Sequence, residues 1–600
     1  MTSPDAKRPV RIANASGFFG DRMSALAEVV RGGPIDVVTG DYLAEVTMAI
    51  LGKQRRKNPD LGYAPTFLAQ LQPVLATVLA SGIKVVVNAG GLNPVGLAQA
   101  VRALGEKAGV APKVAVVAGD DLVPRIDELR ATNEDFASTE SGAPLPKEAG
   151  FVHTANAYLG AWGIVRALEE GADVVICPRV TDASLVVGAA AWWHRWGRAD
   201  WSRLAGAVAA GHVIECGPQA TGGNYSSFQQ IEELVHPAFP IAEVAADGSS
   251  VITKHPGTAG AVTIGTVTAQ LVYEVGGPRY ANPDVVTRLD SIELEEAGAD
   301  RVAIRGVAGE PPPPTTKVAI TTKGTFRNEL TLAFVGLDVD AKIALFERAT
   351  RAALAKTKAA LTFQRIGSPA TNASTQDGAT VLLRVIATSD DESAVSRAFS
   401  SALIEQGLSS YPGLFALDLP GPATETTGYW PTLVAQSALA HTVTHHDGRT
   451  EAIPPPPEMT PLDARVPTVA AAPAAPKGRA GDTLVTAMST LTVAPLGTIV
   501  DARSGDKGSD ANVGLWVRTD EAFTWLASEV TVECLRELLP EARDLRVERY
   551  AFPKLRAVNF VIRGLLAGGA IASLRLDRQA KALGEFLRSR HLAIPKSFLG

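Results

Sequence analysis

The chain has 600 residues, of which 46% are hydrophobic and 20% are charged, which is ordinary for a globular protein. A chain of this length is too long to fold around a single hydrophobic core, so we predict several domains. The net charge of −6 supplies no basic footprint, so nucleic acid is not an expected partner.

The three cysteines are Cys177, Cys216 and Cys534, too few and too widely spaced for a disulfide framework or a metal motif. Such cysteine usage suits a reducing compartment. Met1–Pro9 lacks an apolar signal core, and no uninterrupted apolar run reaches membrane-spanning length. We therefore expect a cytoplasmic protein with no membrane partner.

Residues 1–305 are predicted to form an α/β domain with a parallel, Rossmann-like sheet. Helical stretches alternate there with buried apolar strands, namely a short strand at the start of 11–21, and then 35–38, 83–87, 114–117 and 171–177. Such alternation is typical of parallel strands joined by right-handed helical crossovers. Among the helices, we expect one over residues 154–170.

Two carboxylates follow the second of these strands. Asp41 and Glu45 are four residues apart, so both can lie on one face of a helix. One interpretation is an acid/base pair at the carboxyl edge of the sheet, where open α/β sheets bind their ligands. The other is a helix start that Asp41 caps, with Glu45 exposed. We carry both residues as candidate catalytic groups.

Polar residues also follow two further strands. Asn88, Gly90, Gly91 and Asn93 come after 83–87 as NAGGLNP, and Arg179 and Asp182 come after 171–177. We predict that all six bind substrate at one sheet edge. The fork of Arg179 suits a carboxylate or phosphate, although a salt bridge between Arg179 and Asp182 would equally brace the turn.

The segment Gly211–Gly223 (GHVIECGPQATGG) holds His212, a candidate general acid/base whose alternative is a structural histidine. Gly222 and Gly223 are predicted to offer backbone N–H donors to a carbonyl or phosphate. No catalytic signature surrounds Cys216. Neither a Walker A nor a G-x-G-x-x-G motif occurs in strand–turn–helix context, so neither ATP nor NAD is expected.

Two further groups of basic side chains leave alternatives open. Lys53–Lys57 is a basic run that fits either a solvated helix end or a phosphate-rich ligand. His441 and His445 have a helix-like spacing that can hold a metal, but no Glu lies between them, and we predict no metal-ligating residue.

Three segments follow the first domain. Residues 306–451 mix strands and helices as an α+β second part, and residues 452–488 form a Pro/Ala-rich linker. Residues 489–600 are predicted to form a small ferredoxin-like α+β domain.

The last domain contains a dense polar loop, Asp501–Asn512 (DARSGDKGSDAN). Arg503 and Lys507 are predicted to bind substrate and Asp506 to take part in catalysis; the alternative is a solvated hairpin held by salt bridges. No cofactor is firmly predicted. If a divalent cation assists, the carboxylates suit Mg²⁺ or Mn²⁺, and they are Asp41, Glu45, Asp501 and Asp506.

Several of these motifs together resemble one family. Arg11–Asp21, Gly40–Met48 (GDYLAEVTM), Asn88–Pro94 and Gly211–Gly223 resemble the acyclic terpene utilisation family AtuA. The Asp501–Asn512 loop and its surroundings resemble the ferredoxin-fold module that accompanies AtuA proteins. The resemblance implies bacterial catabolism of citronellol and geraniol through branched acyl-CoA thioesters, and it supplies no catalytic residues.

Two classes of function remain open. The first is a lyase or hydratase that acts on a branched 3-hydroxyacyl-CoA or carboxylic acid. The second is a non-catalytic acyl-CoA-binding or assembly component of a catabolic complex. The tethered last domain and the aromatic cluster Trp192–Trp196 also predict a homo-oligomer.

Overall fold

The computed structural model describes residues 8–132, 134–148, 150–462 and 491–599. The chain divides into two compact units: Met1–Thr321 together with Tyr429–Gly600, and Thr322–Gly428. Most of the predicted linker, from residue 463 onward, lies outside the described residues.

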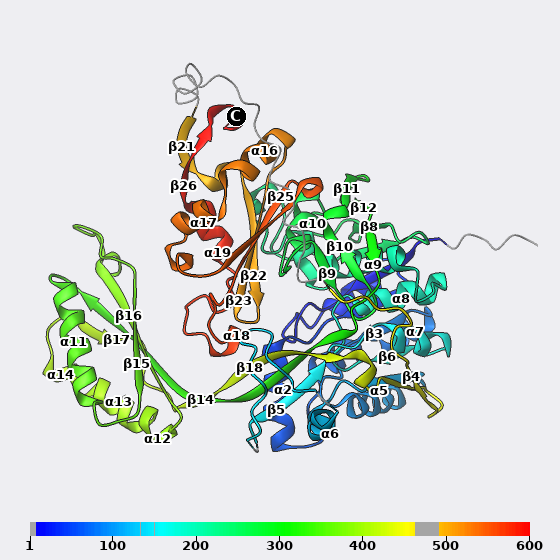
Figure 1. Ribbon diagram of the computed structural model, residues 1–600, viewed down its shortest axis with the longest axis horizontal. Helices are drawn as coiled ribbons and strands as arrows, with labels where there is room; N and C mark the ends of the chain where they lie inside the picture. Colours follow the sequence, from blue (N-terminus) through cyan, green and yellow to red (C-terminus); the bar gives the residue numbers. More distant parts are fainter. Residues whose placement is uncertain (1–7, 133, 149, 463–490, 600) are drawn as a thin grey trace, which may run out of the picture. The chain divides into compact units, whose positions relative to one another are not determined.

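The first unit contains an eleven-stranded mixed sheet (Figure 1). Its five central strands run parallel, in the order β1 (Val10–Asn14), β2 (Val37–Gly40), β3 (Lys84–Val87), β6 (Val174–Ile176) and β4 (Val114–Ala118). The predicted parallel sheet is confirmed for this central part.

Both edges of the sheet are antiparallel, so the Rossmann-like prediction is wrong there. Beside β1 lie β7 (Ile241–Val244), β8 (Ser250–Thr253), β12 (Val302–Arg305) and β11 (Glu293–Glu296). Beside β4 lie β19 (Thr442–Thr444) and β20 (Thr450–Ala452). Short connections such as that between β7 and β8 cannot hold a crossover helix, and they therefore impose antiparallel pairing.

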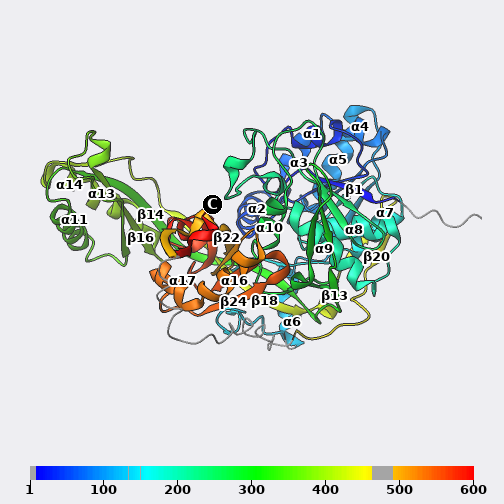
Figure 2. The ribbon, with the colours of Figure 1, turned by 90° about the horizontal axis from the view of Figure 1, so that it is seen from above.

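Helices cover both faces of the parallel strands (Figure 2). Val85 and Val86 belong to separate buried cores, because successive strand side chains face opposite sides. One core takes in α1 (Ala25–Arg31), α3 (Pro65–Leu71), α4 (Leu75–Ala80) and α5 (Pro94–Ala108). The other takes in α7 (Trp162–Glu169), α8 (Ser184–His194), α9 (Trp201–Ile214) and α10 (Ile264–Leu271).

Two local predictions differ from this structure. The helix expected over 154–170 begins as strand β5 (Val152–Ala157), and α7 covers only its second half. His441 and His445 flank the strand β19, so their helix-like relation does not form. In a strand, side chains repeat every two residues and not every 3.6, so four residues no longer means one helical turn.

The second unit is an antiparallel sheet in the order β15 (Ala360–Ile366), β16 (Thr380–Ser389), β14 (Thr315–Val335) and β17 (Leu414–Ala416). The helices α11 (Val339–Ala353) and α13 (Arg397–Ile404) share its buried core, which centres on Phe334, Phe346 and Phe399. The chain enters this unit along β14 and leaves it along β18 (Thr424–Ala435).

The C-terminal domain belongs to the first unit and has its own buried core. Its sheet has the order β22 (Asp501–Lys507), β23 (Asp510–Trp516), β25 (Ala557–Ile562) and β24 (Val547–Phe552), with β21 (Leu491–Pro495) and β26 (His591–Pro595) paired separately. Its main helices are α16 (Asp520–Glu529), α17 (Val532–Leu538) and α19 (Leu583–Ser589).

The Asp501–Asn512 stretch is a hairpin in this domain and not a loop. Asp501 pairs with Trp516, and Lys507 pairs with Asp510 at the turn. Gly508, at φ 65°, provides the left-handed conformation that the turn needs. The polar residues thus lie on paired strands, and the register of the pair determines which face of the sheet each side chain occupies.

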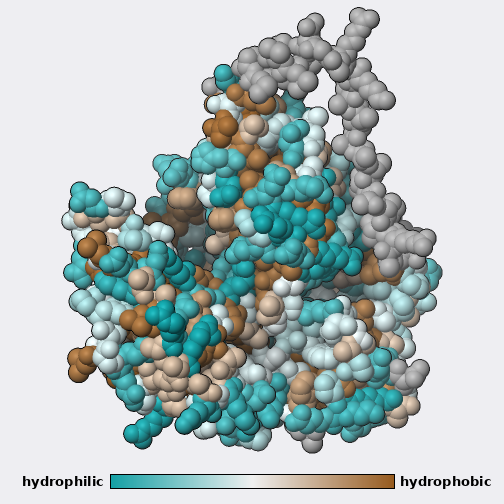
Figure 3. All heavy atoms as spheres, turned by 60° about the vertical axis from the view of Figure 1, so that its left-hand side comes forward, coloured by the Kyte–Doolittle hydropathy of each residue, from teal (hydrophilic) through white to brown (hydrophobic). Residues whose placement is uncertain are grey.

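On the face drawn in Figure 3, hydrophilic residues interleave with smaller hydrophobic groups.

Within the described part of the chain, no helix has the length and apolar character needed to cross a membrane.

Candidate functional site

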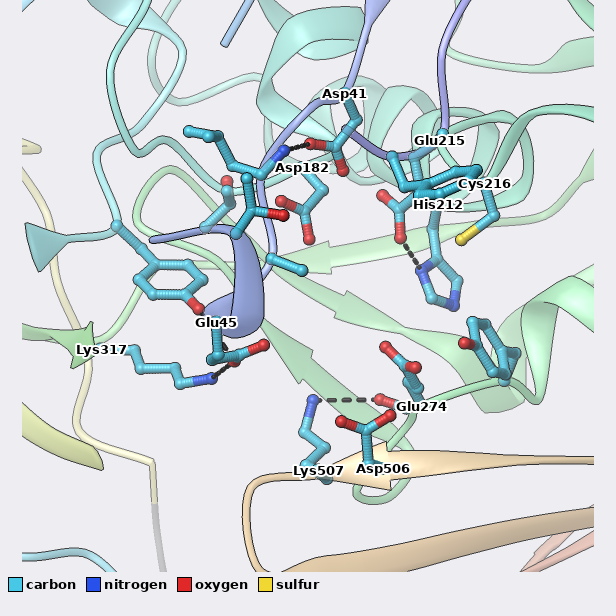
Figure 4. A pocket seen from close by; sticks show the side chains of 18 of the residues that line it. Asp41, Glu45, Asp182, His212, Glu215, Cys216, Glu274, Lys317, Asp506 and Lys507 are labelled. Carbon is cyan, nitrogen blue, oxygen red and sulfur yellow. Dashed lines mark hydrogen bonds and ion pairs between the residues drawn. The ribbon is translucent and has the colours of Figure 1, made fainter. Parts of the chain in front are cut away.

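A cavity of about 850 Å³ lies in the first unit, at the carboxyl ends of β2 and β6 (Figure 4). Acidic and basic side chains line it, namely Asp21, Asp41, Glu45, Asp182, Glu215, Glu274 and Asp506 with Arg179, Lys317, Lys507 and Lys581. The carboxyl edge of parallel strands is where open α/β sheets bind ligands. The C-terminal domain contributes three of these residues, so two parts of the chain distant in sequence build one cavity.

Asp41, Asp182 and Glu215 form what we call the acid cluster, on one side of the cavity in Figure 4. Asn88 Nδ2 donates a 2.5 Å hydrogen bond to Oδ1 of Asp41, which is 6% exposed. Burial raises the pKa of Asp41 well above its usual range, and the charge of Asp182 raises it further. Burial therefore favours the protonated form of Asp41.

Arg179 holds the acid cluster in place. Its guanidinium is buried, donates a 2.5 Å hydrogen bond to Asp182, and lies 4.2 Å from the centre of the Tyr158 ring. Although burial alone would lower the pKa of Arg179, the charges of Asp182 and its neighbours outweigh that effect and raise it. The salt-bridge interpretation of Arg179 and Asp182 thus describes the geometry, and the pair also lines the cavity.

His212 and Glu215 form a hydrogen-bonded pair at the end of α9, with Nδ1 and Oε1 3.0 Å apart. Burial lowers the pKa of His212 to about 4, and the charge of Lys507 acts in the same direction. Burial also raises the pKa of Glu215 well above its usual range, with Asp182 adding to the rise. At neutral pH the imidazole is neutral, and burial favours the protonated form of Glu215.

The opposite side of the cavity holds what we call the lysine cluster: Lys317, Lys507 and Lys581 with Glu45, Glu274 and Asp506. Lys317 Nζ lies 3.1 Å from Oε1 of Glu45, which also accepts hydrogen bonds from the hydroxyls of Tyr158 and Tyr429. Burial would raise the pKa of Glu45, but the charges of Lys317 and Arg179 outweigh it and hold the pKa well below its usual range. Glu45 is therefore ionised.

The hairpin of the C-terminal domain supplies Asp506 and Lys507. Lys507 Nζ donates a 3.0 Å hydrogen bond to the backbone carbonyl of Glu274, and Asp506 lies 3.1 Å from Lys581 Nζ. Burial raises the pKa of Asp506 to about 6, and the charge of Glu274 adds to it. Burial also lowers the pKa of Lys507, as does the charge of Lys317.

Seven carboxyl groups and four cations line the cavity. Burial favours the protonated forms of Asp41 and Glu215, which reduces the negative charge that the cations must offset. The acid cluster can therefore donate protons while the lysine cluster stabilises negative charge. Environments that push similar groups apart in pKa are typical of acid/base sites.

Buried contacts fix the C-terminal domain against this site. Asn512 Nδ2 donates to the backbone carbonyl of Val272 at 3.0 Å, and its Oδ1 accepts from the N–H of Glu274 at 2.7 Å. Asn559 Nδ2 donates to the carbonyl of Val275 at 3.0 Å. Both asparagines are fully buried, so they hold the segment that carries Glu274.

Eight predicted site residues line the cavity: Asp41, Glu45, Arg179, Asp182, His212, Gly223, Asp506 and Lys507. Six do not: Asn88, Gly90, Gly91, Asn93, Gly222 and Arg503. Asn88 supports Asp41 from behind, and Asn93 caps α5 by accepting from the N–H of Gly96. Arg503 stacks over Tyr273 at 4.2 Å and donates to Gln219, so it braces the cavity wall.

The remaining glycines have local conformational roles. Gly222, at φ 113°, ends the short helical turn Gly217–Thr221, and Gly91, at φ 50°, sits against Leu51. A Cβ on Gly90 would lie 2.6 Å from the carbonyl oxygen of Cys177, so this position is closely packed.

Glu215 stands beside His212 in the chemically suggestive GHVIEC motif, although it was not among the predicted site residues. Glu274, Lys317 and Lys581 also line the cavity, but they stand in no distinctive motif. Only the tertiary arrangement brings these three residues to the cavity.

No group of three or more His, Cys, Asp or Glu side chains within the described residues is arranged to hold a metal ion. Of the carboxylates considered for Mg²⁺ or Mn²⁺, Asp501 does not line the cavity and instead accepts a 2.5 Å hydrogen bond from Ser227.

Comparison with known families agrees with this architecture. The model described as "Acyclic terpene utilisation family protein AtuA" matches residues 10–445. The chain belongs to the AtuA family. A second model, the AtuA ferredoxin-like domain, matches residues 494–593, so the predicted ferredoxin-like character of the C-terminal domain is confirmed. No significant match exists among curated proteins or among solved structures.

The AtuA family is implicated in acyclic terpene utilisation. The Asp501–Asn512 hairpin falls within the matched ferredoxin-like domain, and the acid cluster falls within the matched AtuA region. The cavity is therefore shared between the two matched parts of the chain.

Proposed function

We propose that this AtuA protein is a catabolic enzyme of acyclic terpene (citronellol or geraniol) or related branched-acid degradation. It acts as a lyase or hydratase on a branched 3-hydroxyacyl-CoA or carboxylic acid. The observation that carries the proposal is the convergence of proton donors and cations from two domains on one cavity.

Both reaction types require the same three chemical functions. A lyase removes the proton of the 3-hydroxyl, breaks the C2–C3 bond to release a ketone, and protonates the resulting enolate. A hydratase removes a proton from C2 and protonates the departing 3-hydroxyl, which leaves as water. Each therefore needs a base, an acid and donors for enolate oxygen.

The cavity contains a group for each function. Asp506, with a pKa of about 6, is the base that suits neutral pH. Protonated Asp41 and Glu215 are the acids across the cavity, and His212 is a positioning residue that orients Glu215. Lys507, whose ammonium is held by a backbone carbonyl and by no carboxylate within the described ion pairs, stabilises the enolate oxygen.

Apolar side chains complete the cavity wall. Val46 and Ile50 are 36% and 40% exposed, on one face of α2 (Glu45–Lys57). Phe18, Leu433 and Leu462 line the cavity as well and are also partly exposed. Exposed apolar surface beside a charged site suits a substrate with a branched hydrocarbon chain.

Turnover assays test the proposal. The purified protein is incubated with 3-hydroxy-3-methylbutanoyl-CoA, with longer branched homologues and with the free acids, and products are followed by mass spectrometry. We expect conversion, and a fall in kcat/KM of about a hundredfold or more for Asp506→Asn.

Asp544→Asn is the matched control, because it makes the same chemical change at an exposed position of the same domain outside the cavity. It should remain within about twofold of the unaltered protein. Tight binding of a thioester without any conversion would contradict the enzyme proposal and would favour the assembly component.

A further inference from the structure

The basic run Lys53–Lys57 has no part in the site described so far. It forms the last turns of α2, the helix whose first residue, Glu45, lines the cavity. Cations at a helix C-terminus also interact favourably with the helix dipole, which alone would account for one or two of them. Their order along the helix carries more information.

Val46, Ile50, Lys53 and Lys57 are spaced at i, i+4, i+7 and i+11, so they form one stripe along α2. The buried side of the helix is opposite, at Met48 and Leu51. The two apolar members of the stripe line the cavity, and the two basic members lie one and two turns further along the same face.

Arg55 projects from a different face of the helix. Its guanidinium lies 3.2 Å from Asp121, in a surface ion pair that ties the helix end to the segment after β4. Lys57 is exposed at the end of the helix, and Lys53 is partly exposed. The stripe therefore joins an apolar section at the cavity to a cationic section outside it.

We propose that this stripe of α2 is the binding track for coenzyme A, with Lys53 and Lys57 contacting its phosphates. The inference rests on the proposed function and decides in favour of the thioester over the free acid. From Val46 to Lys57 the helix rises roughly 16 Å, at 1.5 Å per residue, comparable to an extended pantetheine arm. The acyl group then occupies the cavity while the nucleotide end reaches the basic turns.

Charge reversal tests the track. We expect Lys53→Glu/Lys57→Glu to weaken the binding of coenzyme A and of adenosine 3′,5′-bisphosphate at least tenfold, measured by calorimetry on the full chain. The affinity of the unaltered protein should fall with rising salt, because exposed charges are screened. Binding of free 3-hydroxy-3-methylbutanoate should change by less than twofold.

The matched control is Lys107→Glu/Lys113→Glu. It makes the same charge change at two exposed positions, at the end of α5 and just before β4, on the opposite edge of the sheet from the cavity. This control should bind coenzyme A like the unaltered protein. Melting curves establish that both double variants are folded.

The outcomes separate this inference from the proposed function. Unchanged coenzyme A affinity in Lys53→Glu/Lys57→Glu overturns the track, as does equal weakening in the control or equal affinity for inorganic phosphate and coenzyme A. Conversion of the free acid but not of its thioester overturns the track and leaves the enzyme proposal standing. Binding that depends on Lys53 and Lys57 without any turnover supports the track and contradicts the enzyme proposal.

Discussion

At the scale of single residues, the site depends on ion pairs that are only partly shielded from water. The side chains of Glu45 and Lys317 retain 28% and 37% exposure, which in this position is exposure to the cavity. Solvent in the cavity screens their attraction, so the pair contributes less to stability than a fully buried pair would. Its main effect is to keep Glu45 ionised.

Lys317→Met is expected to leave Glu45 without its nearest cation. In the unaltered protein the lowered pKa of Glu45 contributes stability above the unfolded-state pKa, and that contribution is lost as pH falls through the folded pKa. Without Lys317, burial dominates and raises the folded pKa above the unfolded one. Stability then falls as pH rises through the new pKa.

The loss of unfolding free energy in Lys317→Met should therefore be larger at pH 8 than at pH 5, on the order of 1 kcal/mol at the higher pH. Melting curves at the two pH values measure it. Glu45→Gln/Lys317→Met removes both charges and should recover most of it. A loss that is the same at both pH values would show that Lys317 acts through packing alone.

Asp506 makes a second pH prediction. Because its pKa is raised to about 6, the folded state retains a proton between about pH 4 and pH 6 that the unfolded state has lost. The contribution of Asp506 to the free energy of unfolding therefore declines as pH rises through this window. Asp506→Asn should flatten the Tm profile in this window while abolishing the acid limb of kcat/KM. Thermal melts and pH–rate profiles of the two proteins measure this, and an acid limb that persists near pH 6 would assign that limb to another group.

At the scale of elements, the sequence predicts what local periodicity determines. The predicted strands 83–87 and 114–117 are confirmed as β3 and β4, because each is a short, continuous apolar run that the sheet buries. The sheet edges were mispredicted, since pairing direction depends on connection length and not on strand composition. Asn93 looked like a ligand and is a helix cap, a role that Asn fulfils equally well.

The site itself was only half predictable. Asp41, Arg179 and Asp182 follow strands, and this signal can be read from one sequence. Glu274, Lys317 and Lys581 reach the cavity because other elements carry them there, and nothing in their own neighbourhoods distinguishes them from surface charges.

The two parts of the site, the α/β part and the C-terminal domain, meet where β23 packs against the segment after α10. A Cβ on Gly514 would lie 2.3 Å from Cγ2 of Val272, so Gly514→Ala must push the C-terminal domain away from Glu274. We expect a loss of about 1–3 kcal/mol, the range for overpacking, and a parallel loss of turnover. Melting curves and activity measure both.

Gly407→Ala is the control for this change. No atom lies within 4 Å of a Cβ at that helical position, so its stability should be unchanged or slightly raised. If Gly514→Ala melts like this control, the close contact is not a feature of the folded protein in solution.

At the scale of the whole molecule, a single chain supplies both sides of the cavity. The α/β part and the C-terminal domain belong to the same compact unit, and both contribute lining residues. The aromatic cluster that suggested oligomerisation makes contacts within the chain: Trp193 donates to the carbonyl of Arg8, and Trp196 to that of Ala246. A homo-oligomer remains our prediction. Light scattering at micromolar concentration measures it, and a monomeric mass would contradict it.

The central claim is that the shared cavity moves protons at the carbon beside a thioester. It is tested most directly by incubating the protein with 3-hydroxy-3-methylbutanoyl-CoA in D₂O and measuring deuterium at C2 of the recovered thioesters by mass spectrometry. The account predicts incorporation that Asp506→Asn reduces about a hundredfold and Asp544→Asn leaves unchanged. Bound thioester recovered without deuterium would contradict it.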